Sequence, residues 1–361
     1  MEHNLIEIID KKISQVRTTS LDISFNELLD MYENEELIIS PEYQRLFRWS
    51  EDKESRFIET LILELPLPPI FVIEVEEGKY ELIDGLQRIS SYLHFRGVKL
   101  PTKDSPLELT DCDIIPELNG LSYDSFPKSL QIKLKRNFIR VEVLRKESDI
   151  NLRYHMFKRL NSGGEILSEQ EIRNCTIRIL NPDINDFMIK LSENSDFINT
   201  TCNISQEEIN KKKNEELVLR FFTLKNDLEN YIYPFDEYLT RYLENVATTK
   251  YHFNYEEEQI NFEKTFKILN KILGKDIFAT QLSSGNYQSN FVLYLYDGLI
   301  LGIQDFLDKL DKFGNIDKLK ELFISIKSNE EIYKKRTGSK SNIKSRISII
   351  NSLLKDFFND N

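Results

Sequence analysis

The order of helix and strand signals in the first hundred residues constrains the fold more than any other feature of the sequence. A helix predicted to start after Ser50 must end at the proline-rich segment 65–69, because proline interrupts helical hydrogen bonding. Two runs rich in β-branched and aromatic residues, 70–76 and 79–83, are joined by a Glu-Gly pair and predict a β-hairpin. A second amphipathic helix is predicted over 86–95. This alternation predicts an α+β fold with a small sheet.

The rest of the chain changes in character after about residue 181. Before that point, the sequence predicts a helix over 128–136, a strand over 138–144 and a capping box that opens a helix at Ser168. After it, long amphipathic helices dominate and strand signals are few. We therefore predict two domains, one of residues 1–181 that contains the sheet and an all-α domain of residues 182–361.

Composition limits the classes of function. The chain of 361 residues has 48 lysines and arginines against 60 aspartates and glutamates, a formal net charge of −12. This balance excludes a protein that is basic over its whole surface, but it is compatible with a local basic site for nucleic acid. The three cysteines form no C-x-x-C pair, so we predict neither a disulfide framework nor a cysteine zinc site. No apolar run approaches the roughly 18 residues of a membrane span, and we expect a soluble, cytoplasmic protein without membrane contact.

The junction between the second predicted hairpin strand and the next helix is the first candidate site. The strand ends at Asp84, Gly85 permits a tight turn, and the free N–H groups of the helix that follows favour an anion. Gln87 and Arg88 add an amide and a guanidinium that suit phosphate, and Asp84 is placed to hold Mg²⁺ or a water. The alternative is structural, with Asp84 as the helix N-cap and Arg88 paired with a surface acid.

Two other segments combine basic residues with features of a ligand site. If the segment around residue 45 is a regular strand, Tyr43, Arg45, Phe47 and Trp49 lie on one side of it, which suits a phosphate and a stacked base. The alternative is that the aromatic side chains fill the core. The third segment, 157–164, ends a basic helix with Gly-Gly, which permits close approach of a nucleotide or serves as an ordinary helix end.

In this order, the three segments resemble a known family. The patterns are P-x-Y-Q-R-x-x-x-W, I-D-G-x-Q-R between a strand and a helix, and F-x-R-L-N-S-G-G-x-x-L-S-x-x-E-I-R-N. They are similar to the N-terminal domain of GmrSD-type restriction proteins, over about residues 18–225. Leu86 stands where the family most often has Gln. The resemblance implies a ParB/sulfiredoxin-like N-terminal domain with a small mixed sheet, followed by helices.

The resemblance also implies a function. It points to binding and hydrolysis of an NTP, with Mg²⁺, by a restriction or anti-phage defence protein that acts on DNA, and it assigns the chemistry to Asp84, Gln87 and Arg88. Further residues would line the nucleotide site, namely Tyr43, Gln44, Arg45, Gly85, Arg159 and Asn161. The partners it implies are DNA, including modified phage DNA, and it admits a separate nuclease subunit or further copies of this chain.

Missing motifs keep a second function open. The sequence has no Walker A motif, and none of its four histidines lies in an HNH-type nuclease motif; for His94 we expect a packed or surface position. The alternative is therefore a non-catalytic, nucleotide-gated DNA-binding or sensor subunit that works with a separate nuclease. A third, less favoured alternative is an NTP-independent nuclease.

Two basic segments are candidates for contact with the DNA backbone. The first, predicted as the DNA-binding site, is a C-terminal island without acids that consists of Lys334, Lys335, Arg336, Lys340, Lys344 and Arg346. The second is the helix predicted over 128–136, with Lys128, Lys133, Lys135 and Arg136. The alternative for the island is a solvated loop before an amphipathic helix.

Overall fold

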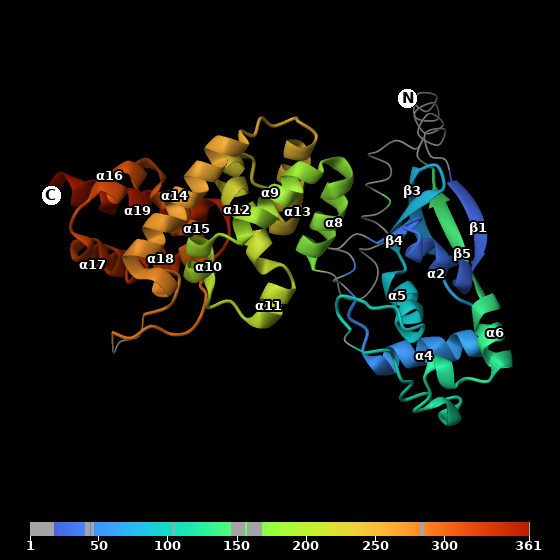
Figure 1. The fold of residues 1–361 in the computed structure, drawn as a ribbon. Helices are drawn as coiled ribbons and strands as arrows, with labels where there is room; N and C mark the ends of the chain where they lie inside the picture. The colour runs from blue at the N-terminus through green and yellow to red at the C-terminus, as the bar shows by residue number, and fades with distance from the viewer. Residues whose placement is uncertain are drawn as a thin grey trace. The chain divides into compact units, whose positions relative to one another are not determined.

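The structure, a computed structural model, forms two compact units (Figure 1). Unit 1 is Met1–Leu167 and unit 2 is Ser168–Asn361. The residues that the structure describes are 18–39, 44, 47–103, 105–145, 156, 168–281 and 285–360. In this part of the chain, no helix is long and apolar enough to cross a membrane.

Unit 1 contains a mixed sheet of five strands in the order β1-β5-β3-β4-β2. The strands are β1 (Thr18–Ser24), β2 (Leu37–Ile38), β3 (Ile70–Glu76), β4 (Lys79–Asp84) and β5 (Phe138–Leu144). Strands β1 and β5 pair antiparallel, as do β3 and β4, whereas β3 pairs parallel with β5 and β2 pairs parallel with β4. The α+β class and the small mixed sheet are confirmed, and so are the predicted hairpin and the strand at 138–144.

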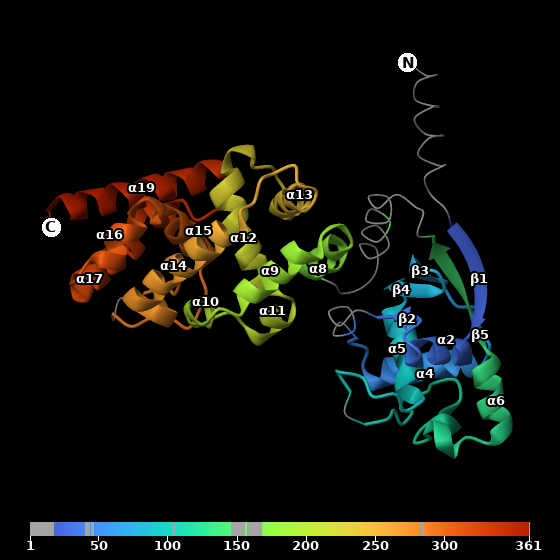
Figure 2. The same cartoon turned by 45° about the horizontal axis from the view of Figure 1, so that its top comes forward.

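Four described helices pack around this sheet. They are α2 (Phe25–Glu33), α4 (Glu51–Ile62), α5 (Leu86–Phe95) and α6 (Lys128–Arg136). Helix α2 contacts β1, β2, α5 and α6, and α4 contacts α5 and α6 (Figure 2). Their apolar faces, which include Phe25, Ile58 and Leu93, are buried. The predicted helices α4, α5 and α6 are therefore confirmed, whereas β1 and α2 carried no recognised signal.

The segment around residue 45 is not a regular strand in its described residues, so the condition for placing its side chains on one side of a strand is not met there. Strand β2 ends at Ile38, Gln44 is helical, and Phe47–Ser50 has no regular structure. Phe47 is buried in the core instead of lying on one side of a strand. The backbone N–H groups just after it are bonded to α5 rather than to a neighbouring strand, as described below.

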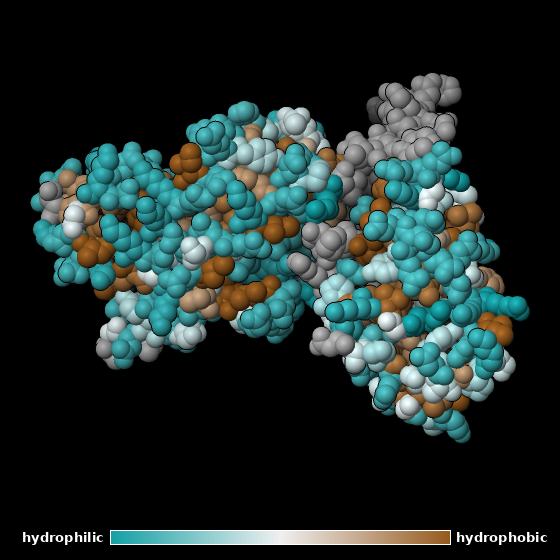
Figure 3. Space-filling model, in the orientation of Figure 1, coloured by the Kyte–Doolittle hydropathy of each residue, from teal (hydrophilic) through white to brown (hydrophobic). Residues whose placement is uncertain are grey.

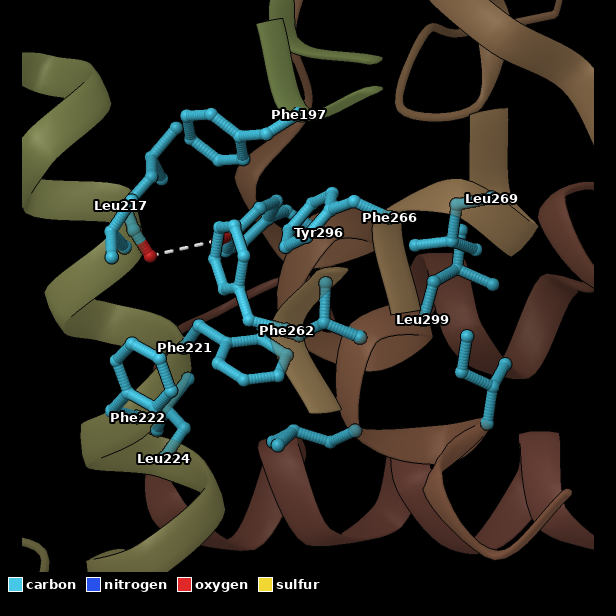
Figure 4. Close-up of a cluster of buried hydrophobic side chains, with 14 of the residues drawn as sticks. Phe197, Leu217, Phe221, Phe222, Leu224, Phe262, Phe266, Leu269, Tyr296 and Leu299 are labelled. Atoms are coloured by element: carbon cyan, nitrogen blue, oxygen red, sulfur yellow. Dashed lines mark hydrogen bonds between the residues drawn. The ribbon is translucent and has the colours of Figure 1, made fainter. Parts of the chain in front are cut away.

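Unit 2 is helical in its described residues. Its helices are α8 (Glu169–Leu180), α9 (Pro182–Ser192), α10 (Ser195–Thr201), α11 (Gln206–Asn210), α12 (Lys213–Asp227), α13 (Phe235–Ala247), α14 (Tyr255–Leu273), α15 (Leu293–Gly302), α16 (Leu307–Lys312), α17 (Ile316–Lys327), α18 (Glu330–Lys334) and α19 (Lys340–Asp360). Phe221, Phe262 and Phe266 form the centre of its core (Figure 4). The buried Tyr296 hydroxyl donates a hydrogen bond to the Leu217 carbonyl at 2.7 Å, so this buried polar group has a partner (Figure 4).

The division between the units lies between Leu167 and Ser168, ahead of the predicted boundary at 181/182. Helix α8 accounts for the difference, because it packs against α9, α12 and α13 of unit 2. The predicted capping box is present: Glu171 N–H donates to Ser168 Oγ at 3.2 Å, and Ser168 N–H donates to the Glu171 carboxylate at 2.8 Å. Ser168 therefore starts the helical unit.

Candidate functional site

The turn between β4 and α5 has the predicted strand–glycine–helix geometry. Strand β4 ends at Asp84 and α5 starts at Leu86, with Gly85 between them at φ 104°. A Cβ atom on Gly85 would lie 2.3 Å from Ile70 Cγ2, on the first residue of β3. A side chain at position 85 is therefore disfavoured by both the backbone conformation and the space available. The N-terminus of α5 is brought close to the start of β3 in this way.

Arg88 connects this turn with the loop before β3. Its Nη2 donates to Asp84 Oδ2 at 3.0 Å, and its Nη1 donates to the carbonyl oxygens of Pro68 and, at 3.1 Å, Pro69. The Arg88 side chain is 15% exposed and that of Asp84 is 32% exposed. The structural alternative predicted that Arg88 pairs with an acid, and this pairing is present. It also predicted Asp84 as the helix N-cap, which is wrong, since Gly85 is the N-cap and no side chain caps α5.

Gln87 holds a separate segment against the start of α5. Its Oε1 accepts hydrogen bonds from the backbone N–H groups of Arg48 and Trp49, both at 3.1 Å. Lys103 Nζ donates to the Trp49 carbonyl at 3.0 Å from the other side. In the structure, Gln87 therefore positions the segment Phe47–Trp49. This anchoring of two backbone groups 38 and 39 residues away was not evident from the sequence.

A buried charged cluster supports the same segment, and sequence reasoning missed it. The Glu54 carboxylate is completely buried; it is 2.7 Å from His94 Nδ1 and 2.5 Å from Lys103 Nζ. His94 Nε2 lies 2.6 Å from the Ser105 carbonyl oxygen. Buried charges are retained when they are paired and hydrogen-bonded in this way. His94 is thus a packed residue, as expected, and no sequence spacing signalled its partners.

The other predicted ligands are brought to this site only in part. Gln44 Nε2 donates to the Tyr32 hydroxyl of α2 at 2.7 Å, so this amide is engaged with α2. Tyr43, Arg45, Arg159 and Asn161 lie outside the described residues. The described site therefore consists of Asp84, Gly85, Gln87 and Arg88 with the segment Phe47–Trp49.

In the described part of the chain, the structure limits which side chains are available for metal binding and for thiol chemistry. No group of three or more His, Cys, Asp and Glu side chains in that part is placed to hold a metal ion. Magnesium that arrives with a nucleotide typically uses one or two protein carboxylates together with phosphate oxygens, and a role for Asp84 toward Mg²⁺ stays a prediction. Burial raises the pKa of the Cys112 thiol to about 11, which keeps it protonated and unreactive at neutral pH.

The C-terminal basic island differs from its prediction at Arg346. This side chain is completely buried, with Nη2 3.7 Å from Asp297 and Nη1 donating to the carbonyls of Lys335 and Thr337. Asp297 also accepts two hydrogen bonds from Arg220, at 2.5 and 2.7 Å. The predicted contact of Arg346 with DNA is therefore wrong, because the guanidinium is an ion-pair partner in the core of unit 2.

Acids outside the island, one distant in the sequence and two just before it, pair with several of its other cations. Lys340 and Lys344 contact Glu229 at 3.3 and 2.5 Å. Lys334 lies within 3.4 Å of Glu330 and Glu331 on α18. The positive potential of the island is therefore lower than its sequence alone indicates. A role for the exposed members of the island in DNA binding stays a prediction.

Comparison with known proteins agrees with the resemblance. No match was found among curated proteins or among solved structures. Residues 25–178 match the family described as the GmrSD restriction endonuclease, N-terminal domain. The matched range includes all three motifs and the whole of the site at the start of α5. Residues 25–178 of this chain are thus similar to the N-terminal domain of a family of restriction endonucleases.

Proposed function

We propose that the protein binds and hydrolyses an NTP and acts on DNA within a restriction or anti-phage defence system. The observation that carries this proposal is the grouping of Asp84, Gly85 and Arg88 at the first turn of α5. The N-terminus of a helix favours phosphate through its N–H groups and its dipole, and a guanidinium adds a charge-assisted donor. The restriction family that the N-terminal domain resembles supports DNA as the target.

The ion pair between Asp84 and Arg88 indicates how the site would respond to a nucleotide. A phosphate that reaches Arg88 competes with Asp84 for the same guanidinium, and the released carboxylate is then available for a water or for nucleotide-borne Mg²⁺. Arg88 would stabilise the charge that develops on the transferred phosphoryl group. Asp84 would orient the attacking water, and Gln87 would keep the segment Phe47–Trp49 beside the site.

Binding and turnover of NTPs by two variants test this assignment. Arg88→Ala should weaken NTP binding at least tenfold, whereas Asp84→Asn should retain binding and lose most phosphate release. Arg56→Ala is the matched control, because Arg56 pairs with the exposed Asp111 elsewhere in unit 1. Binding and turnover equal to wild type in a folded Arg88→Ala protein would rule out the site.

A second candidate function is a nucleotide-gated sensor without hydrolysis. It is favoured by the hydrogen bonds that tie Arg88 and Gln87 to two loops, since loss of these bonds on ligand binding would move both loops. It is also consistent with the absence of an HNH-type motif from this sequence. The purified chain, incubated with plasmid DNA, Mg²⁺ and each NTP, separates the two functions. Saturable binding without phosphate release or nicking supports the sensor, and turnover supports the enzyme.

A further inference from the structure

An open groove of about 930 Å³ lies in unit 1 between α6, the start of β5 and the loop 64–69. One wall is a single face of α6, formed by Ser129, Ile132, Lys133 and Arg136 at positions i, i+3, i+4 and i+7. We call this feature the α6 groove. Its volume is at the upper end of the range of about 300–1,000 Å³ that small-molecule sites span.

The α6 groove exposes apolar side chains to an unusual degree. Phe138, the first residue of β5, is 62% exposed, and Leu65 and Ile132 are 44% and 40% exposed. In Figure 3, apolar and polar side chains alternate at the edge of unit 1 where Figure 1 places α6. Several exposed apolar side chains gathered in one groove with polar neighbours are typical of a binding site. Phe138 supplies an aromatic face within it.

The α6 groove has a small excess of positive charge. Three cations line it, Lys133, Arg136 and Arg140, against two acids, Asp22 and Glu64. Two cations of the groove have carboxylate partners, Lys133 with Glu64 at 3.3 Å and Arg140 with Asp22 at 3.0 Å. Among the described residues, no carboxylate lies within ion-pair distance of Arg136. The groove therefore combines an exposed ring with a surplus of positive charge.

We propose that the α6 groove binds a single-stranded nucleic-acid segment, with one base stacked on Phe138 and the adjoining phosphates on Arg136 and Lys133. Stacking on an aromatic ring together with a basic groove is the usual means of binding single strands without sequence preference. Phosphate contacts match the surplus charge on α6, whereas an apolar partner helix would leave it unmatched. This inference rests on the proposed function in taking DNA as the partner, and it locates the contact away from the C-terminal island.

The groove also adjoins the candidate nucleotide site. Pro69 lines the groove, and its carbonyl accepts a hydrogen bond from Arg88 at 3.1 Å. A change at Arg88 is therefore transmitted to the loop wall of the groove through the hydrogen bonds to the Pro68 and Pro69 carbonyls. These contacts give a direct physical connection between nucleotide binding and nucleic-acid binding.

Fluorescence anisotropy with a labelled oligo-dT strand tests the proposal in the full-length protein. Phe138→Leu keeps an apolar side chain but loses the aromatic face, and should weaken binding by about tenfold or more. Phe138→Trp should keep the affinity, with quenching of the new indole on binding. Arg136→Ala should lower the slope of log Kd against log salt by about 0.7, the value for one phosphate contact on a single strand.

The controls separate failure of this inference from failure of the proposed function. Lys99→Ala removes an exposed lysine of unit 1 outside the groove and should leave affinity and slope unchanged. If wild type binds the strand but Phe138→Leu and Arg136→Ala match it, the groove is not the site, and the proposed function stands. If wild type binds neither single strand nor duplex at low salt, both the groove and the DNA part of the proposed function fail. Tighter binding of duplex than of single strand overturns the groove alone.

Discussion

At the residue scale, the turn from β4 into α5 requires a position without a side chain. Gly85 has a φ of 104°, and its missing Cβ leaves room for Ile70 Cγ2. The sequence predicted a tight turn at Gly85, because a strand signal and a helix signal adjoin there. The close approach of Ile70, which lies 15 residues earlier, was not predictable from local spacing.

Gly85→Ala should therefore lower the free energy of unfolding by about 2–4 kcal/mol, the sum of a left-handed alanine and of steric overlap in a packed region. The matched control is Gly97→Ala, which also has positive φ (82°) but has no atom within 4 Å of the added Cβ. It should cost only about 1–2 kcal/mol. Urea unfolding of the two variants measures the difference. Equal losses would mean that the contact with Ile70 carries no energetic weight.

Lys327 gives a prediction about pH. Burial lowers the pKa of this amine from 10.5 to about 8, against the raising effect of Asp276. Its Nζ donates to the Asp276 carbonyl and lies 4.2 Å from the centre of the Tyr287 ring. Between pH 8 and 10.5, the unfolded chain binds more protons at this group than the folded protein does. The stability of the wild-type protein therefore gains from this group as the pH rises through that window.

Lys327→Met removes this titration. The variant should be more stable than wild type at pH 7 by about 1–2 kcal/mol, since it avoids burial of a charge. This advantage should shrink as the pH rises from about 8 to 10.5. Urea unfolding of both proteins at pH 7, 8, 9 and 10 follows the difference. A difference that stays constant across these pH values would contradict the lowered pKa.

At the scale of elements, the segment Phe47–Trp49 owes its position to side chains from other parts of unit 1. Gln87 on α5 accepts from two of its N–H groups, and Lys103 donates to the Trp49 carbonyl. The Trp49 ring also contacts Phe57 of α4, with a centroid distance of 5.9 Å. The segment is thus anchored to both helices.

Loss of the Gln87 anchor is detectable through Trp49, the single tryptophan of the chain. Gln87→Ala removes the acceptor of the Arg48 and Trp49 N–H groups, so the segment should loosen. We expect acrylamide quenching of Trp49 fluorescence to rise and the emission maximum to shift to longer wavelength. Ser122→Ala, a change in an exposed turn of unit 1, is the control. Emission and quenching identical to wild type in Gln87→Ala would contradict the anchoring role.

Elements whose signals are local were predicted correctly from the sequence. The hairpin β3–β4, helix α6 and the capping box at Ser168 each depend on residues within a few positions of one another. Features that depend on distant pairs were not predicted. Examples are the pairing of β1 with β5 and the burial of Arg346 against Asp297, which join positions far apart in the chain. Charge counted along the sequence cannot indicate which acids the fold will bring to a cation.

The candidate site was predictable in position but not in its contacts. The Asp-Gly-Leu-Gln-Arg motif located it, because the strand–turn–helix pattern is local. The contacts that its residues make could be assigned only from the folded structure. Arg88 bonds to the loop before β3, and Gln87 bonds to the backbone of Phe47–Trp49. Since these partners lie 19 and 39 residues away, no spacing rule indicated them.

At the scale of the whole molecule, the net charge of −12 and the local basic sites are compatible. Acidic side chains keep the surface as a whole from attracting nucleic acid, and they pair with most of the C-terminal island. Helix α6 of unit 1 has no acid of its own and is flanked by an exposed ring. DNA binding by this protein should accordingly be local and strongly dependent on salt.

Calorimetric titration of the full chain tests whether the first turn of α5 binds an NTP. ATP, GTP, CTP and UTP are each titrated with Mg²⁺ into wild type, Arg88→Ala and the control Arg56→Ala. We expect saturable binding of at least one NTP by wild type and Arg56→Ala, and loss of that binding in a folded Arg88→Ala protein. Absence of binding by wild type for all four, or equal binding by Arg88→Ala, would contradict this expectation.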